Sequence, residues 1–131
     1  MNSYAAVYGM LTGATALTVL VEDRIYPTVM PDRPTFPSVT YQKLAGHVEH
    51  GAESDPGLKR ATFQVTSWAS SLFEAVTVAK QVLAAVNRVR KTTVAGVAVD
   101  DCLVAGDGID SFDPSTKVHF IHITFDIHYR E

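Results

Sequence analysis

Histidine and aspartate side chains gather near the end of the chain and are the first candidates for chemistry. His122, Asp126 and His128 fall at even spacing in a segment of alternating polarity, so an extended strand would place them on one face. Asp126 and His128 would lie about 7 Å apart and could share a metal ion with help from a neighbouring strand. His122 and His128 would be roughly 20 Å apart, too far for one ion. Hydrogen-bonded histidines on a polar sheet surface are the simpler interpretation.

The remaining candidates are a cysteine and three aspartates. Cys102 is the only cysteine, and in a segment rich in valine and leucine a free thiol is usually a small buried hydrophobe. Asp107, Asp110 and Asp113 recur every three residues, without the alternating acids and distal glutamate of a calcium loop. We interpret them as solvated turn residues. We therefore expect no catalytic residue, no cofactor and no metal site.

Composition also bears on the class of protein. The chain has 131 residues and a net charge of −3, which suits one domain and argues weakly against a dedicated nucleic-acid reader with a basic face. The glycine-rich phosphate loops and the G-x-S-x-G elbow are absent from the sequence. The single cysteine excludes an intrachain disulfide.

The N-terminal third predicts a helix followed by a stiff connector. Apolar residues recur at spacings of three and four from Tyr4 to Val21, capped by Asn2 or Ser3. No cation precedes this stretch, and threonine, glycine and tyrosine interrupt it, so a folded helix is favoured over a signal segment or a membrane span. Four prolines then fall between Pro27 and Pro37, which favours an extended connector. We expect Ile25 and Tyr26 to dock on the core or a neighbour, and Asp23 to pair with Arg24.

Strand and helix patterns follow in alternation. The sequence predicts strands over 37–48 and 59–70 as an antiparallel pair, joined by a polar loop over 46–58. An S-x-x-E capping box at Ser71 then begins a helix that reaches residue 89, with cations after it. Residues 92–113 read as a strand with a break at 100–101 and a loop at 106–108. Residues 117–131 form the most regular strand, with isoleucines on one face and histidines on the other.

These elements predict an α+β fold in the order α-β-β-α-β-β. We expect an antiparallel sheet of four strands, or slightly more, with two helices packed on one face. The other face would be solvated or would meet another subunit.

Several segments, in collinear order, resemble the tail-completion, or tail terminator, proteins of long-tailed bacteriophages and prophages. The resemblance covers nearly the whole chain, 1–131, as a single domain. Its segments are "ALTVLVEDRIYP", "PDRPTFPSVTYQKLAG", "RATFQVTSWASSLFEAVTVAKQVLAAV", "GVAVDD" and "DPSTKVHFIHITFDIHYRE".

The resemblance implies a structural virion protein without enzymatic activity, assembled in the bacterial host cytoplasm. It implies a ring, usually of six subunits, that caps the head-proximal end of the tail tube. Its partners would be the tail-tube protein and a head-completion or connector protein, with DNA passing through the lumen without sequence-specific binding and no membrane involved. A head-completion or connector component of the same virion is a close alternative.

A rival from another class is a small α+β enzyme or ligand-binding module. Its pocket, between sheet and helices, would be lined by Cys102 or by the His122, Asp126 and His128 group.

For the ring, heterologous contacts are needed, and we expect the 46–58 loop to reach a neighbour or the tail tube. Trp68 either anchors the strand-to-helix joint or lies at an interface. The expected interface residues are Tyr26, Arg33, His50, Glu53, Asp55 and Trp68.

Overall fold

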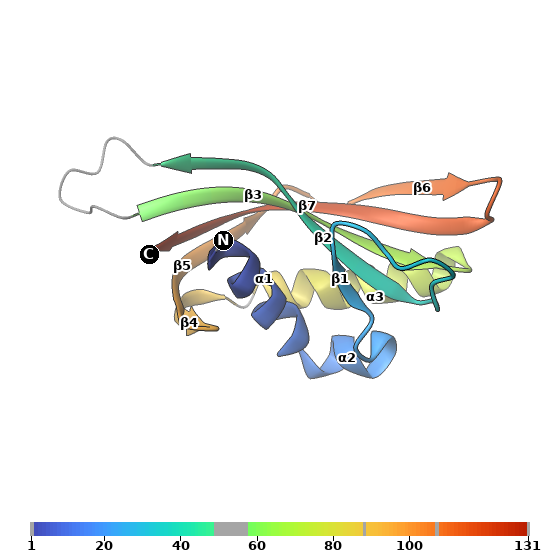
Figure 1. The fold of residues 1–131 in the computed structure, drawn as a ribbon, viewed down its shortest axis with the longest axis horizontal. Helices are drawn as coiled ribbons and strands as arrows, with labels where there is room; N and C mark the ends of the chain where they lie inside the picture. The colour runs from blue at the N-terminus through green and yellow to red at the C-terminus, as the bar shows by residue number, and fades with distance from the viewer. Residues whose placement is uncertain (1, 49–57, 88, 107, 131) are drawn as a thin grey trace.

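One strongly curved sheet and three helices make up the part of the protein that the structure describes (Figure 1). The computed structural model describes residues 2–48, 58–87, 89–106 and 108–130. Within these ranges the sheet has seven strands. Six follow the order β1-β2-β3-β7-β5-β4, and β6 pairs with the first part of β7, which β5 leaves free. The strands are β1 (Ile25–Pro27), β2 (Ser38–Val48), β3 (Leu58–Ala69), β4 (Arg90–Val94), β5 (Val97–Val104), β6 (Ile109–Asp113) and β7 (Val118–Arg130).

The α+β class is confirmed, but the predicted four-stranded antiparallel sheet is wrong in detail. All the pairings are antiparallel except that of β1 with β2, which is parallel, so the sheet is mixed. The long central pair β3 and β7 runs in register from Leu58 opposite Arg130 to Ala69 opposite His119. The predicted antiparallel pairing of β2 with β3 is confirmed.

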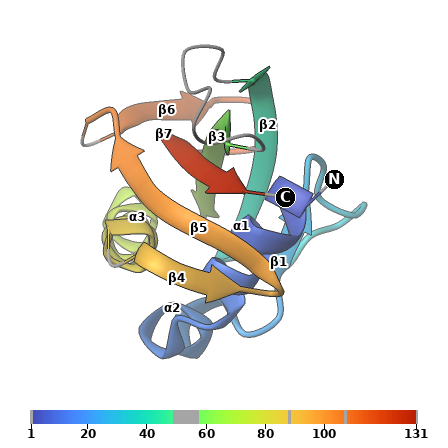
Figure 2. The same ribbon diagram turned by 90° about the vertical axis from the view of Figure 1, so that its left-hand side faces the viewer.

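All three helices lie on one face of the sheet, the inner face (Figures 1 and 2). They are α1 (Asn2–Thr12), α2 (Thr15–Val21) and α3 (Leu72–Asn87). The predicted alternation of β7 is confirmed, because Ile121, Ile123, Phe125, Ile127 and Tyr129 are buried against these helices. Phe63 on β3 stacks on Phe125 with ring centroids 6.1 Å apart at the centre of this core.

The predicted first helix is two helices, bent by 81° at Gly13 and Ala14. Ala14 has extended backbone angles, and the Gly13 N–H bonds back to the Gly9 carbonyl, so α1 ends there. The three- and four-residue spacing continues across the break from Leu11 to Leu17, which is why the periodicity did not reveal it. Within the described residues no single helix is long and apolar enough to cross a membrane. The bent pair of α1 and α2 would be long and apolar enough together, by length and composition alone.

Two small residues of α1, Gly9 and Ser3, lie against the rest of the fold. A β-carbon on Gly9 would lie 2.8 Å from a Val94 methyl group, so the glycine permits a close approach of α1 to β4. Ser3 lies inside α1 and is fully buried, so it is not the predicted N-cap residue.

The connector that holds the four prolines from Pro27 to Pro37, here called the proline segment, begins with a short strand that the sequence did not indicate. β1 pairs in parallel with the start of β2, Ile25 opposite Val39, and the buried Ile25 docks on the core as expected. Arg24 pairs with Glu22 at 2.6 Å rather than with Asp23, and its Nε donates to the Pro37 carbonyl at 2.8 Å. These contacts attach both ends of the connector to its own subunit.

The region after α3 differs most from the prediction. The helix begins as expected, with the Ser71 hydroxyl accepting from the Glu74 N–H at 3.2 Å. However, α3 ends at Asn87, so the predicted helix-terminal cations Arg90 and Lys91 lie instead in β4. Ala95 and Gly96 both have positive φ and turn β4 into β5. Alanine is unusual in such a tight turn, so no sign of the turn was visible in the sequence. The segment 92–113, predicted as one interrupted strand, therefore contains parts of three strands, β4, β5 and β6.

Candidate assembly interface

The face of the sheet turned away from the helices, the outer face, carries side chains in cross-strand rows. One row runs Tyr26, Thr40, Thr66, His122 and Ile109 over β1, β2, β3, β7 and β6. The register of each pair places these residues directly opposite one another, where side chains contact across strands. The row is therefore ordered across five strands, with Thr40 and Thr66 buried and the other three residues at least partly exposed.

Trp68 and Phe120 form an aromatic end of this face. Their rings stack with centroids 4.8 Å apart, and the Trp68 indole N–H donates to the Thr40 hydroxyl at 2.9 Å. Both side chains remain partly exposed. Stacking and hydrogen bonding fix the indole orientation, so this end presents a rigid, half-open aromatic surface of the kind enriched at interfaces.

His122 continues the aromatic end toward the centre of the face. Its Nδ1 lies 2.8 Å from the Thr66 hydroxyl, and its ring meets Phe120 edge-on at 5.2 Å. Burial lowers the pKa of His122, because desolvation disfavours the charged imidazolium. The histidine is therefore a neutral, hydrogen-bonded part of the surface, as the simpler interpretation predicted.

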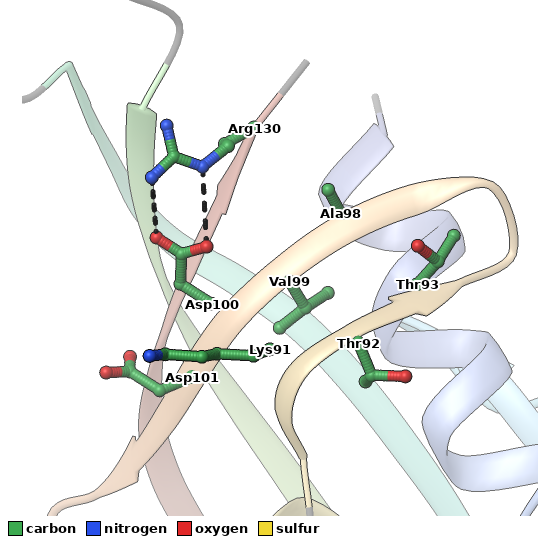
Figure 3. Close-up of a pocket in the computed structure, with 8 residues that line it drawn as sticks. All are labelled: Lys91, Thr92, Thr93, Ala98, Val99, Asp100, Asp101 and Arg130. Atoms are coloured by element: carbon green, nitrogen blue, oxygen red, sulfur yellow. Dashed lines mark hydrogen bonds and ion pairs between the residues drawn. The ribbon is translucent and has the colours of Figure 1, made fainter. Parts of the chain in front are cut away.

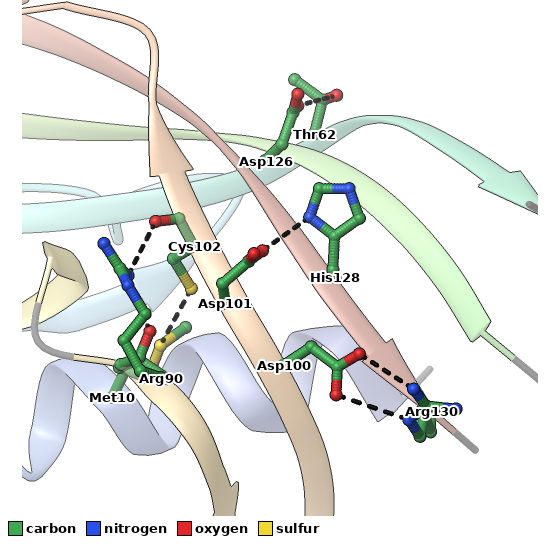
Figure 4. Close-up of polar contacts among 10 residues, drawn as sticks. Met10, Thr62, Arg90, Asp100, Asp101, Cys102, Asp126, His128 and Arg130 are labelled. Carbon is green, nitrogen blue, oxygen red and sulfur yellow. Dashed lines mark hydrogen bonds and ion pairs between the residues drawn. The ribbon is translucent and has the colours of Figure 1, made fainter.

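The opposite end of the outer face is charged (Figure 4). His128 Nδ1 donates to an Asp101 oxygen at 2.8 Å, and the Arg130 guanidinium contacts the Asp100 carboxylate at 3.1 and 3.4 Å. A register shift between Val99 and Asp101 allows the two consecutive aspartates to reach different partners on β7. The predicted break at 100–101 is this bulge.

A shallow hollow of about 570 Å³ adjoins this charged end, between β4 and β5 (Figure 3). Lys91, two threonines, Asp100, Asp101 and Arg130 are among its lining residues. The Arg130–Asp100 ion pair spans part of it. Asp101 is paired with His128 on β7. Within the described residues no three His, Cys, Asp or Glu side chains are grouped to hold a metal ion.

The two groups named for the rival enzyme pocket lie on different faces of the sheet. Cys102 is buried on the inner face, with its sulfur 3.7 Å from that of Met10, whereas His122, Asp126 and His128 lie on the outer face. The group of His122, Asp126 and His128 therefore does not lie between sheet and helices, whereas Cys102 is one of the residues that line a hollow of about 360 Å³ beside α3. Burial raises the pKa of the Cys102 thiol to about 12, so it is not a thiolate nucleophile near neutral pH.

Comparison with known proteins identifies the family. The model of the family described as tail completion protein gp17 matches residues 5–130. The chain belongs to this family. A chain from the virion of a native gene transfer agent particle shares the fold with a TM-score of 0.72 and 15% identity, over 97% of this chain and 93% of that one. A second solved structure gives a TM-score of 0.62 and 18% identity, over 99% and 94% of the two chains. No curated protein matches.

Membership in the tail completion family confirms the resemblance read from the sequence and makes this chain a structural tail protein of the phage type. A structural tail protein needs a surface that meets other proteins of the particle. The outer face is the best candidate for it.

The predicted interface residues scatter over this tail completion protein. Tyr26 and Trp68 both lie on the outer face, in adjacent rows, and Arg33 is exposed on the proline segment. His50, Glu53 and Asp55, together with most of the 46–58 loop, lie outside the described residues, as does Asp107. Asp110 and Asp113 belong to β6, so they are strand residues rather than loop acids.

Two aromatic residues were missed, although the sequence marks both. Phe120 falls on the polar face of the alternating segment 117–131, and Phe73 falls outside the apolar stripe of α3. Phe73 is 84% exposed, and Leu72 beside it is 45% exposed. A large apolar residue on the polar face of an element is the signal that would have found them.

Proposed function

We propose that this protein forms a ring, expected to contain six copies, at the head-proximal end of the phage tail tube. The ring ends tube growth and joins the tail to the head connector. The match of the tail completion family over residues 5–130 is the observation that carries the proposal. The likeness to a chain of a gene transfer agent virion supports a place in a phage-like particle.

The fold supports a ring in two ways. The outer face offers rigid aromatic and charged ends, and the helix face offers exposed apolar residues of α3. A closed ring needs two different patches on each subunit, and these faces supply them. The net charge of −3 suits a lumen that lets DNA slide without gripping it.

A phage that lacks the gene tests the function. We expect tails that are of irregular length or that fail to join heads, seen by electron microscopy of the lysate. Complementation with the wild-type chain should restore complete particles. Normal, head-joined tails of uniform length in the absence of the protein would overturn the proposal.

The 46–58 loop is expected to contact a neighbouring subunit or the tail-tube protein. Deletion of residues 52–56, which removes Glu53 and Asp55, should weaken ring assembly or tail attachment. Unchanged assembly and attachment of this variant would show that the loop has no such role.

A further inference from the structure

An exposed phenylalanine projects from the first turn of α3. Phe73 is 84% exposed, the most exposed of the large apolar side chains in the described part of the chain, and Leu72 beside it is 45% exposed. Burying such a ring in a partner pocket removes a large apolar area from water. A single exposed apolar residue needs no explanation, but a cavity of the matching kind exists on this same chain.

The matching cavity lies at the aromatic end of the outer face. It has a volume of about 330 Å³, larger than one phenylalanine side chain, and its walls are mainly Met30, Pro34, Phe36, Trp68 and Val118. The walls are held in place, because Trp68 is fixed by Phe120 and Thr40, and the Ser38 hydroxyl donates to the Met30 sulfur at 3.0 Å. The proline segment is thus one wall of a preformed apolar pocket.

Phe73 and the pocket lie on opposite sides of the sheet. Alternation along β3 turns Trp68 to the outer face, whereas Ser67 points inward and its hydroxyl donates to the Ala75 carbonyl of α3 at 3.0 Å. Phe73 therefore cannot enter the pocket of its own subunit. A projection on one side and a pocket on the other are what a head-to-tail contact between identical subunits requires.

We propose that Phe73 of one subunit inserts into the pocket formed by Met30, Pro34, Phe36, Trp68 and Val118 of the next. This inference rests on the proposed ring and names the contact that closes it. The occupant of the pocket is a second copy of this chain.

Charge complementarity supports a second copy as the occupant. Arg33 and Lys117 are exposed beside two pocket residues, Pro34 and Val118, and the carboxylate of Glu74 follows Phe73 on α3. None of these three charges has an ion-pair partner in the described part of the chain. The Asp113 carboxylate at the pocket is already engaged by the Ser115 N–H at 3.0 Å and hydroxyl at 2.8 Å. These hydrogen bonds lower the pKa of the Asp113 carboxyl, so it stays charged. Asp113 and Asp32, which is exposed beside Arg33, are therefore the two opposing charges on that rim.

Disulfide cross-linking in completed tails tests the contact directly. The double variant Phe73→Cys/Thr116→Cys, used to complement a phage that lacks the gene, should give a ladder of linked subunits on non-reducing gels. Thr116 lines the pocket, and the buried Cys102 does not interfere. The control Val19→Cys/Thr116→Cys uses a position on α2 that is 73% exposed and outside the proposed contact, so it should give no ladder.

Ring stability tests the contribution of the side chain. Phe73→Ala should raise the dissociation constant of the ring at least about tenfold, as expected for a central aromatic anchor, measured by sedimentation or native mass spectrometry. Val19→Ala is the matched control and should leave it unchanged. Glu74→Lys should weaken the ring, and Lys117→Glu in the same chain should restore part of the loss.

The outcomes separate this inference from the function it rests on. Wild-type protein present in tails or rings, with no ladder from the Phe73→Cys variant and no effect of Phe73→Ala, would overturn the contact and leave the ring function standing. Normal tails without the protein would overturn the function itself. Because Phe73 is exposed, Phe73→Ala should keep the thermal midpoint of the monomer, which shows that any loss of rings is a loss of contact.

Discussion

The two faces of β7 alternate with the same regularity, yet their side chains have different surroundings. The inner residues, such as Ile123 and Phe125, are fully buried against helices of the same subunit. The outer residues, such as His122, Asp126 and His128, each hydrogen bond to one side chain on a neighbouring strand and stay partly exposed. The inner face thus determines whether the chain folds, whereas the outer face holds polar and aromatic groups in fixed positions at least partly open to solvent.

Removing an inner aromatic ring should have the largest effect. Phe63→Ala is expected to destabilise the fold by about 3–5 kcal/mol, because the fully buried ring leaves a cavity beside Phe125 and Tyr4. The free energy of unfolding from urea titration measures this. Gln64→Ala, one residue along β3 on the outer face, is the control and should change it by less than about 0.5 kcal/mol. Equal effects of the two would contradict the division between the faces.

Among the outer residues, Trp68 is the one whose removal should lower the free energy of unfolding by the amount closest to that for the removal of an inner residue. Trp68→Ala is expected to cost about 2 kcal/mol, less than a fully buried ring, through loss of the stack on Phe120 and of the bond to Thr40. Trp68→Phe should recover most of this, because the stack remains. The same urea titrations serve as the measurement, and an effect of Trp68→Ala below about 0.5 kcal/mol would show that the aromatic end is not structurally fixed.

Sequence patterns predicted some elements of the fold and missed others, and the difference has a physical reason. The strand of residues 117–131 and the capped helix at Ser71 follow from local periodicity and short-range bonds, and both are confirmed. The bend at Gly13 and the Ala95–Gly96 turn were missed because the apolar spacing crosses the first and the second lacks a typical turn residue.

Long-range contacts were beyond the reach of local patterns. The parallel pairing of β1 depends on where the connector returns, and the Thr62–Asp126 bond joins residues 64 positions apart. Alternation predicts which face a residue occupies, but only the strand register decides its partner. The pocket beside Trp68 likewise combines three distant segments.

The bond between Thr62 and Asp126 should contribute a smaller amount. The Thr62 hydroxyl donates to the carboxylate at 2.6 Å, so Thr62→Val removes a donor while keeping the shape. We expect a loss of about 1.5 kcal/mol in the free energy of unfolding. Thr124→Val, on the same face of β7, is the control and should be near neutral. A loss as large as that of Phe63→Ala would indicate that the outer face also determines folding.

The smallest expected effect is a dependence of stability on pH that comes from His122. Burial holds the pKa of His122 below its usual range, so the unfolded chain binds the proton more readily than the folded one. The contribution to stability is therefore complete above the unfolded pKa of about 6.5 and declines as the pH falls from there toward the folded pKa. His122→Gln, which cannot be protonated, should flatten the decline in the free energy of unfolding between about pH 7 and pH 5. Urea titrations at several pH values measure this, with His119→Gln as the control on the same strand. A steeper decline in the His122→Gln variant would mean that the imidazole is stabilised in its charged form, and that the centre of the outer face is more open to water than its hydrogen bond with Thr66 implies.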